Sequence, residues 1–251
     1  MKSYRTNTGP FDERPFFSST EIDRMCVEEL RNQGLYPSEP SPIRIDRFVE
    51  KRFGVQPAYE ELPAGLLGFT AFGAKGVQGI FVSKPLDDEG TTVAERRLRT
   101  TLAHEAGHGL LHAHLFALAG DAKRLFGSGV SDDGTKILCR GEAPDAGLRT
   151  GRSSPWWEYQ ANLMMGALLL PRPLVNEALA SLHVAHGERR ILPRARRDGA
   201  IRRLSEVFDV NPIVAHIRLK SLSILSDAPT ASGAWPFVRR VRLGRRPSLP
   251  K

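Results

Sequence analysis

The chain has 251 residues, of which 41% are hydrophobic and 25% charged, a balance typical of a globular protein with its own core. Two cysteines, Cys26 and Cys139, are too few for a disulfide framework, and the polar N-terminus lacks the apolar segment of a secretory signal. The most apolar run, Leu163 to Leu170, is too short to cross a bilayer. We therefore expect a cytoplasmic protein that does not bind membranes.

The formal net charge of +8 is unevenly distributed along the chain. Between Arg189 and Lys251 there are 15 Lys and Arg against 4 Asp and Glu, whereas acidic residues slightly outnumber basic ones in the remainder. Such a basic segment is compatible with a solvated tail or with contact to nucleic acid or an acidic partner.

The first half of the chain predicts an arm, two helices and a small sheet. Residues 1–19 are polar and contain prolines, so a flexible arm is expected there. Apolar residues at helical spacing predict helices that end at Gly34 and Gly54. Short apolar runs between glycines then predict two or three strands, including residues 66–72 and 79–82.

A long buried helix is predicted over about residues 92–118. The sequence Thr92-Val93-Ala94-Glu95 fits a capping box. Apolar residues then recur every four residues from Leu98 to Leu110 and are joined by Leu111, Leu115 and Leu118. The following segment, 119–155, is rich in Gly, Asp and Ser, which predicts an irregular connection.

The last third predicts further helices and a basic tail. The helix over about 156–170 ends at Pro171, and Pro173 opens another that reaches about residue 185. A helix pair follows at 200–208 and 213–222, with Asn211 as the N-cap of its second helix. Residues 227–251 are expected to form a tail.

The middle of the long helix carries His104-Glu105-Ala106-Gly107-His108, an H-E-x-x-H motif. Histidines four residues apart project from one helix face, so both imidazoles can reach one Zn²⁺ ion. Glu105 then faces the remaining coordination position and is the candidate general base. A hydrolytic zinc site needs a third protein ligand and an open position.

Two residues are candidates for that third ligand. His114 stands six residues after His108, but Leu111 occupies the place of the glycine that breaks the helix in H-E-x-x-H-x-x-G-x-x-H proteins. Glu158 begins the helix over 156–170 and would complete a two-histidine, one-glutamate set, although glutamate is also common in a first turn because of the helix dipole.

Over roughly residues 40 to 226 the chain resembles the ImmA/IrrE family of zinc metallopeptidases. The resemblance is carried by His104 to His112, Cys139-Arg140, Trp157 to Asn162 with its E-x-x-A-N pattern, Ala167 to Pro171, Leu204 to Val210, and Arg218-Leu219. It implies that Glu158 is the third ligand beside His104 and His108, and that Glu105 is catalytic.

Other polar residues near the motifs have open roles. Tyr159, His112 and Arg140 are alternative donors to an oxyanion, and the sequence does not select one. Asn162 is either a hydrogen-bond partner of a ligand or a surface residue. For His112, a core histidine bonded to a backbone carbonyl is the simpler expectation.

These features predict an α+β fold, mostly helical and gluzincin-like, with a sheet of about three strands and a C-terminal helix-turn-helix-like pair. The expected divisions are an arm at 1–19, a metallopeptidase domain at 20–190, a helical subdomain at 191–226 and a tail at 227–251.

The predicted function is zinc-dependent peptide hydrolysis, and the resemblance implies a transcriptional repressor as the protein substrate. The alternative is a DNA-binding or protein-binding regulator, such as a toxin-antitoxin partner, with a structural metal. The apolar start of the second helix of the pair, Pro212 to Ala215, makes direct DNA reading the weaker alternative.

Overall fold

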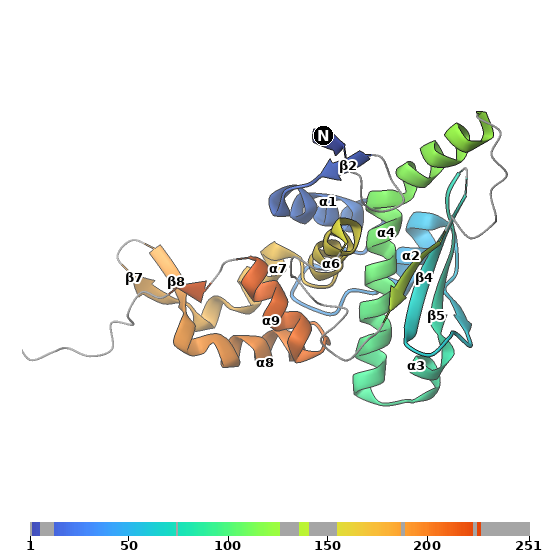
Figure 1. Ribbon diagram of the computed structural model, residues 1–251. Coiled ribbons are helices and arrows are strands. Elements are labelled where there is room, and N and C mark those ends of the chain that lie inside the picture. Colours follow the sequence, from blue (N-terminus) through green and yellow to red (C-terminus); the bar gives the residue numbers. More distant parts are fainter. Residues whose placement is uncertain are drawn as a thin grey trace, which may run out of the picture.

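The computed structural model describes residues 2–5, 13–73, 75–125, 136–140, 155–186, 189–222 and 225–226. It shows a mixed α+β architecture dominated by helices. The long helix α4 (Thr92–Leu125) runs through the middle, with a sheet on one side and the helices α1 (Ser19–Asn32) and α6 (Trp156–Leu169) on the other (Figure 1). Because α4 is covered on both sides, every residue from Thr101 to Gly109 is buried.

The main sheet has four strands in the order β3-β5-β4-β6. Their bounds are β3 (Ala58–Glu60), β4 (Leu66–Gly73), β5 (Gly76–Ser83) and β6 (Lys136–Arg140). β4 and β5 form an antiparallel hairpin, β6 pairs antiparallel with β4, and β3 runs parallel to β5. The predicted strands at 66–72 and 79–82 are confirmed. The expectation of an irregular connection over 119–155 is wrong in part, because α4 continues to Leu125 and β6 adds a fourth strand.

The helices before the sheet begin and end for local reasons that the sequence indicates. α1 has a capping box in which the Ser18 side chain accepts from the Glu21 amide and the Glu21 carboxylate accepts from the Ser18 amide. α2 (Ile45–Phe53) ends at Gly54, whose φ of 70° is left-handed. The short α3 (Lys84–Asp88) leads into α4. There the cap is Thr91, whose side chain accepts from the Ala94 amide, one residue before the predicted Thr92.

The chain after α6 turns sharply at Pro171 and enters α7 (Arg172–Ala178). The helix predicted to reach about residue 185 ends earlier, and a 3₁₀ turn, η2 (Ala180–Leu182), leads into β7 (Val184–His186). A second small sheet joins β7, β8 (Arg189–Pro193) and β9 (Leu225–Ser226), and η3 (Arg194–Arg196) precedes the C-terminal helices.

The helix pair α8 (Arg197–Val207) and α9 (Pro212–Ser221) contacts the rest of the molecule through ion pairs and hydrogen bonds. Asp209, in the turn between them, has a left-handed φ of 50° and contacts Arg96 and Arg99 of α4 at 2.8 and 2.5 Å. Asn211 occupies the predicted N-cap position, but its side chain makes no capping bond. In α9, buried Arg218 donates to the Leu170 carbonyl at 3.0 Å and to Asp23 of α1 at 2.6 Å.

The N-terminal segment, expected to be a flexible arm, contributes two paired strands, β1 (Lys2–Arg5) and β2 (Glu13–Phe16). Beyond β2, Phe17 packs against the main hydrophobic core, which lies between α1, α2, α4, α6 and the C-terminal pair. Among the described residues, no helix has both the length and the apolar character that crossing a membrane requires.

Candidate metal centre

The long helix presents the two histidines of the H-E-x-x-H motif toward α6. His104 and His108 are one turn apart, are 3% and 0% exposed, and have their rings in edge-to-face contact with centroids 4.7 Å apart. A spacing of four residues places both on one face because an α-helix has 3.6 residues per turn.

A glycine between the histidines allows α6 to approach this face closely. A Cβ added at Gly107 would lie 3.0 Å from the Ala161 carbonyl oxygen and 3.2 Å from the Met164 Cβ. Such distances leave no room for a side chain without movement of one helix. The close packing brings the first turn of α6, and with it Glu158, over the two imidazoles.

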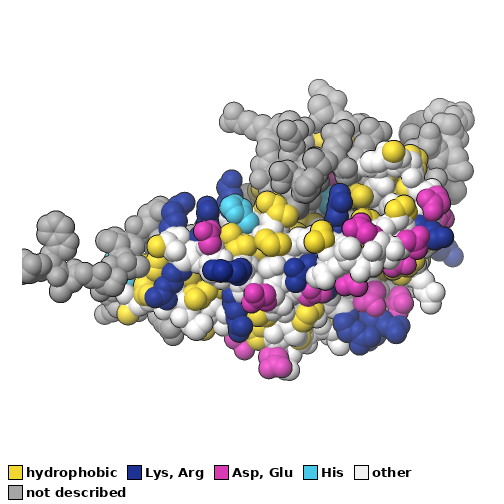
Figure 2. Space-filling model, turned by 90° about the horizontal axis from the view of Figure 1, so that it is seen from below, with side chains coloured by type: hydrophobic (Ala, Val, Ile, Leu, Met, Phe, Trp, Pro, Cys, Tyr) yellow, Lys and Arg dark blue, Asp and Glu magenta, His cyan; other side chains and the backbone are white. Residues whose placement is uncertain are grey.

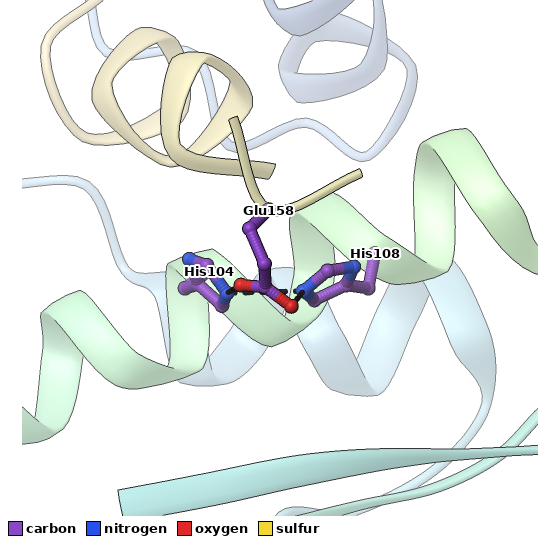
Figure 3. Close-up of side chains that lie close together, drawn as sticks. All are labelled: His104, His108 and Glu158. Carbon is purple, nitrogen blue, oxygen red and sulfur yellow. Dashed lines mark hydrogen bonds and ion pairs between the residues drawn. The ribbon is translucent and has the colours of Figure 1, made fainter. Parts of the chain in front are cut away.

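Figure 3 shows the Glu158 carboxylate pointing between the two rings. Its Oε2 lies 3.1 Å from His104 Nε2, its Oε1 lies 3.5 Å from His108 Nε2, and the two Nε2 atoms are 3.0 Å apart. Zinc bonds of 2.0–2.2 Å at tetrahedral angles separate neighbouring ligand atoms by about 3.3–3.6 Å, so the observed spacings are equal to this or slightly shorter. The three groups therefore fit a small divalent ion, and His104, His108 and Glu158 can together hold a metal.

The other nitrogen of His104 has a partner that defines its tautomer. His104 Nδ1 lies 3.0 Å from Asn162 Oδ1, one turn after Glu158 on α6. Because that oxygen accepts, Nδ1 donates its hydrogen, and in the neutral ring Nε2 keeps a lone pair directed at the candidate site. Of the two roles left open for Asn162, the structure favours the ligand partner, since its side chain is buried beside His104.

The protonation states suit metal binding. Burial lowers the pKa of His108, which favours the neutral imidazole. Burial acts to raise the pKa of Glu158, but the close contacts with His104 and His108 outweigh burial and hold that pKa well below its usual range, so the carboxylate is ionised. A neutral imidazole and an ionised carboxylate are the forms that ligate a divalent cation.

Glu105 lies on the side of α4 that faces the sheet. Its carboxylate is fully buried and accepts a hydrogen bond from the Thr70 hydroxyl of β4 at 2.6 Å. β4 comes this close because Gly68 has no side chain: a Cβ there would lie 2.8 Å from both the Phe81 carbonyl oxygen and the Thr101 Cγ2, and 3.5 Å from the Glu105 Cγ. The ligands and the candidate base are thus held by different neighbours of one helix.

The remaining candidates fall elsewhere. His114 is exposed and does not belong to the metal-binding group found among the described residues, so of the two alternatives the structure brings only Glu158 to the histidines. Tyr159 is 38% exposed on α6. Arg140 ends β6, and its side chain lies outside the described part of the chain.

His112 is buried, as expected, but its partners are side chains instead of a backbone carbonyl. Its two ring nitrogens lie 3.0 Å from His108 Nδ1 and 3.2 Å from Gln160 Oε1. Sequence reasoning missed Thr70 and Gln160. The only signal for either was a polar residue within an otherwise apolar strand or helix.

No family model matches the chain, and no curated protein matches it at a significant level.

Proposed function

We propose that this protein is a zinc-dependent metallopeptidase. The observation that carries the proposal is the convergence of His104, His108 and Glu158, whose ligand atoms lie within 4.8 Å of one another. Two histidines and a glutamate are the ligand set of many zinc peptidases, in which a fourth position stays open for water or substrate. A bound zinc ion supplies a Lewis acid, which polarises a carbonyl and lowers the pKa of water from 15.7 to about 7.

Glu105 is the general base of the proposed reaction. Its carboxylate takes a proton from the attacking water and then delivers it to the nitrogen of the leaving amine. The hydrogen bond from Thr70 to Glu105 Oε2 fixes the carboxylate and stabilises its ionised form. Asn162, through His104 Nδ1, orients one ligand in the same way.

The proposed substrate class is a regulatory protein, with a transcriptional repressor as the first candidate. This part rests on the resemblance of the two helix motifs, His104 to His112 and Trp157 to Asn162, to the ImmA/IrrE metallopeptidases. Zinc as the resident metal is likewise proposed from the donor set, because imidazole and carboxylate ligands suit several divalent ions.

The test separates metal binding from hydrolysis. The full chain and its Glu105→Gln variant are loaded with zinc, checked for metal content by mass spectrometry, and incubated with a library of peptides from a proteome digest. We expect one zinc per chain in both proteins and new peptide N-termini with the wild type only. Identical peptide patterns from the two zinc-loaded proteins would overturn the assignment. A second arm incubates the zinc-loaded wild type with the protein encoded beside this one. Cleavage of that protein at a single peptide bond would support a regulatory protein as the substrate.

The alternative function, a DNA-binding regulator with a structural metal, draws support from α8, where Arg197, Arg202 and Arg203 are exposed. However, Asp198 and Glu206 are also exposed on this helix. On the face at the bottom of Figure 1, where α8 lies, basic side chains are interspersed with acidic and apolar ones (Figure 2).

The second helix of the pair is also poorly suited to a DNA groove. Val214 and Ala215, near the start of α9, are buried, and Arg218 is bonded internally to Asp23. A recognition helix instead exposes its first turns to base edges. This packing favours a role for α9 in holding α6 and α1 together, so the peptidase remains the first proposal.

A further inference from the structure

A continuous chain of buried hydrogen bonds runs from the candidate metal centre to the N-terminal strand β2. His108 Nδ1 lies 3.0 Å from His112 Nδ1, His112 Nε2 lies 3.2 Å from Gln160 Oε1, and Gln160 Nε2 donates to the Pro15 carbonyl at 2.7 Å. His108 and His112 are 0% exposed and Gln160 is 3% exposed, so bulk water does not compete with these contacts.

The direction of every hydrogen bond follows from the far end of this chain. A backbone carbonyl oxygen only accepts, so the Gln160 amide nitrogen must face Pro15. The Gln160 carbonyl oxygen therefore faces His112, and it too only accepts. His112 Nε2 must then carry the hydrogen.

The same logic extends to the metal ligand. A charged ring at His112 would be a buried cation whose two hydrogen-bonding partners are an imidazole and a neutral amide, an arrangement that disfavours the charged form. The neutral ring with hydrogen on Nε2 keeps a lone pair on Nδ1. His108 Nδ1 donates to that lone pair, so the lone pair of the neutral His108 ring is on Nε2, the atom that faces Glu158 and His104.

We propose that His112 and Gln160 are positioning residues, which together with the Pro15 carbonyl hold His108 in the tautomer that can bind a metal ion. The inference rests on the proposed metal centre and adds a structural connection to it, because β2 then helps to position one of its ligands. In this arrangement the proline contributes only its carbonyl, which the adjoining strand holds in place.

A second set of contacts connects β2 to the same hydrogen-bonded chain of His108, His112 and Gln160, which we call the relay. The Trp156 ring lies edge-to-face on His112, with centroids 5.6 Å apart. Arg14, the neighbour of Pro15, places its guanidinium 5.9 Å from the centroid of that indole. The hairpin of β1 and β2 therefore covers the relay with both a hydrogen bond and a cation–π contact.

The first experiment measures zinc affinity by chelator competition on the full chain, without any peptide substrate. His112→Phe keeps a ring but removes the acceptor for His108 Nδ1. We expect the dissociation constant for zinc to rise about 10- to 100-fold. His112→Gln restores an accepting oxygen and is expected to recover part of that loss. The matched control is His114→Phe, an exposed position on the same helix, which should leave affinity unchanged. Equal affinities for wild type and His112→Phe would overturn the proposal.

The second experiment needs no variant. In the full chain labelled with ¹⁵N-histidine, NMR should show His112 as the neutral Nε2–H tautomer and His108 with hydrogen on Nδ1, both before and after zinc is added. His112 with hydrogen on Nδ1 would refute the relay. Circular dichroism of the metal-free variants checks that they fold. Neither readout involves hydrolysis, so the two proposals can fail separately. A chain that binds zinc but cleaves nothing would contradict the proposed function without contradicting the role of His112 and Gln160. If the chain binds no zinc, the NMR tautomers of His108 and His112 still test the proposed hydrogen-bond directions.

Discussion

The substitution Gly107→Ala tests whether the close approach of α4 and α6 assembles the metal centre. The new methyl group would lie 3.0 Å from the Ala161 carbonyl oxygen and 3.2 Å from the Met164 Cβ. Its nearest neighbours are backbone and Cβ atoms, which cannot move away without moving a helix. We therefore expect α6 to shift by a few tenths of an ångström, carrying Glu158 with it.

Two opposing contributions determine the effect on stability. Replacing glycine by alanine within a helix stabilises it by about 1 kcal/mol. Overpacking of a tight contact costs about 1–3 kcal/mol. The free energy of unfolding of the metal-free chain should therefore fall by no more than about 2 kcal/mol, so the variant is expected to fold.

The effect on zinc affinity has no such compensation. If the metal-free variant relieves its strain by separating the helices, zinc binding must restore the contact and so costs the same 1–3 kcal/mol. Since each 1.4 kcal/mol is tenfold, the dissociation constant should rise about five- to hundredfold. The control is Gly199→Ala in α8, where the added Cβ meets nothing within 4 Å. It should raise the free energy of unfolding by about 0.5–1 kcal/mol and leave zinc affinity unchanged.

Urea unfolding of the metal-free proteins and chelator competition would be measured on both variants. A Gly107→Ala protein that binds zinc as tightly as the wild type would refute the reasoning, because it would show that the helix spacing does not set the ligand geometry.

Three further predictions concern single contacts. Thr70→Val removes the hydrogen bond to Glu105, which is worth about 1.5–3 kcal/mol for an ionised acceptor. The rate of peptide cleavage should therefore fall about ten- to hundredfold while the zinc content stays unchanged. An unaltered rate would contradict the proposed role of Thr70. Asp23→Asn leaves buried Arg218 without its ionised partner and should lower the free energy of unfolding by about 3–5 kcal/mol in urea titrations; a loss below 1 kcal/mol would show that the pair is dispensable. Hydrogen bonds from the N-cap serine's amide and hydroxyl lower the pKa of Glu21 below its ordinary 4.5, so this contribution to stability is present above pH 4.5 and is lost as the pH falls through the folded-state value. Glu21→Gln should flatten that part of the stability profile, and an unchanged acid slope would exclude the capping box as its source.

The parts of the site that the sequence could predict depend on local spacing. His104 and His108 share a face in any helix, and the uninterrupted leucine pattern makes His114 the weaker candidate for the third ligand. For Glu158 the helix dipole is an equally good explanation, and only the resemblance to a known family favours its role as a ligand. The structure brings its carboxylate to 3.1 Å from His104, so Glu158 belongs to the group that could hold a metal ion.

The parts that the sequence could not predict depend on contacts between distant segments. Thr70 is 35 residues from Glu105, and Gln160 is 145 residues from Pro15, so no periodicity links either pair. The strand β6 lay in a Gly- and Ser-rich stretch whose pairing is set by the exposed edge of β4. The N-terminal segment is predicted as a flexible arm in part because its hydrogen bond to Gln160 uses a backbone carbonyl, which any residue could supply.

These distant contacts explain why a core helix tolerates so many polar side chains. His104, Glu105, His108 and His112 are all 3% exposed or less, and buried polar groups destabilise a fold unless each is hydrogen-bonded. Each of the four has a partner on another segment or on the next histidine, and the partners come from α6 on one side and β4 on the other. An apolar helix would pack in the same place without needing any of them. The stability of this fold therefore does not require the polar arrangement, whereas the proposed metal site does.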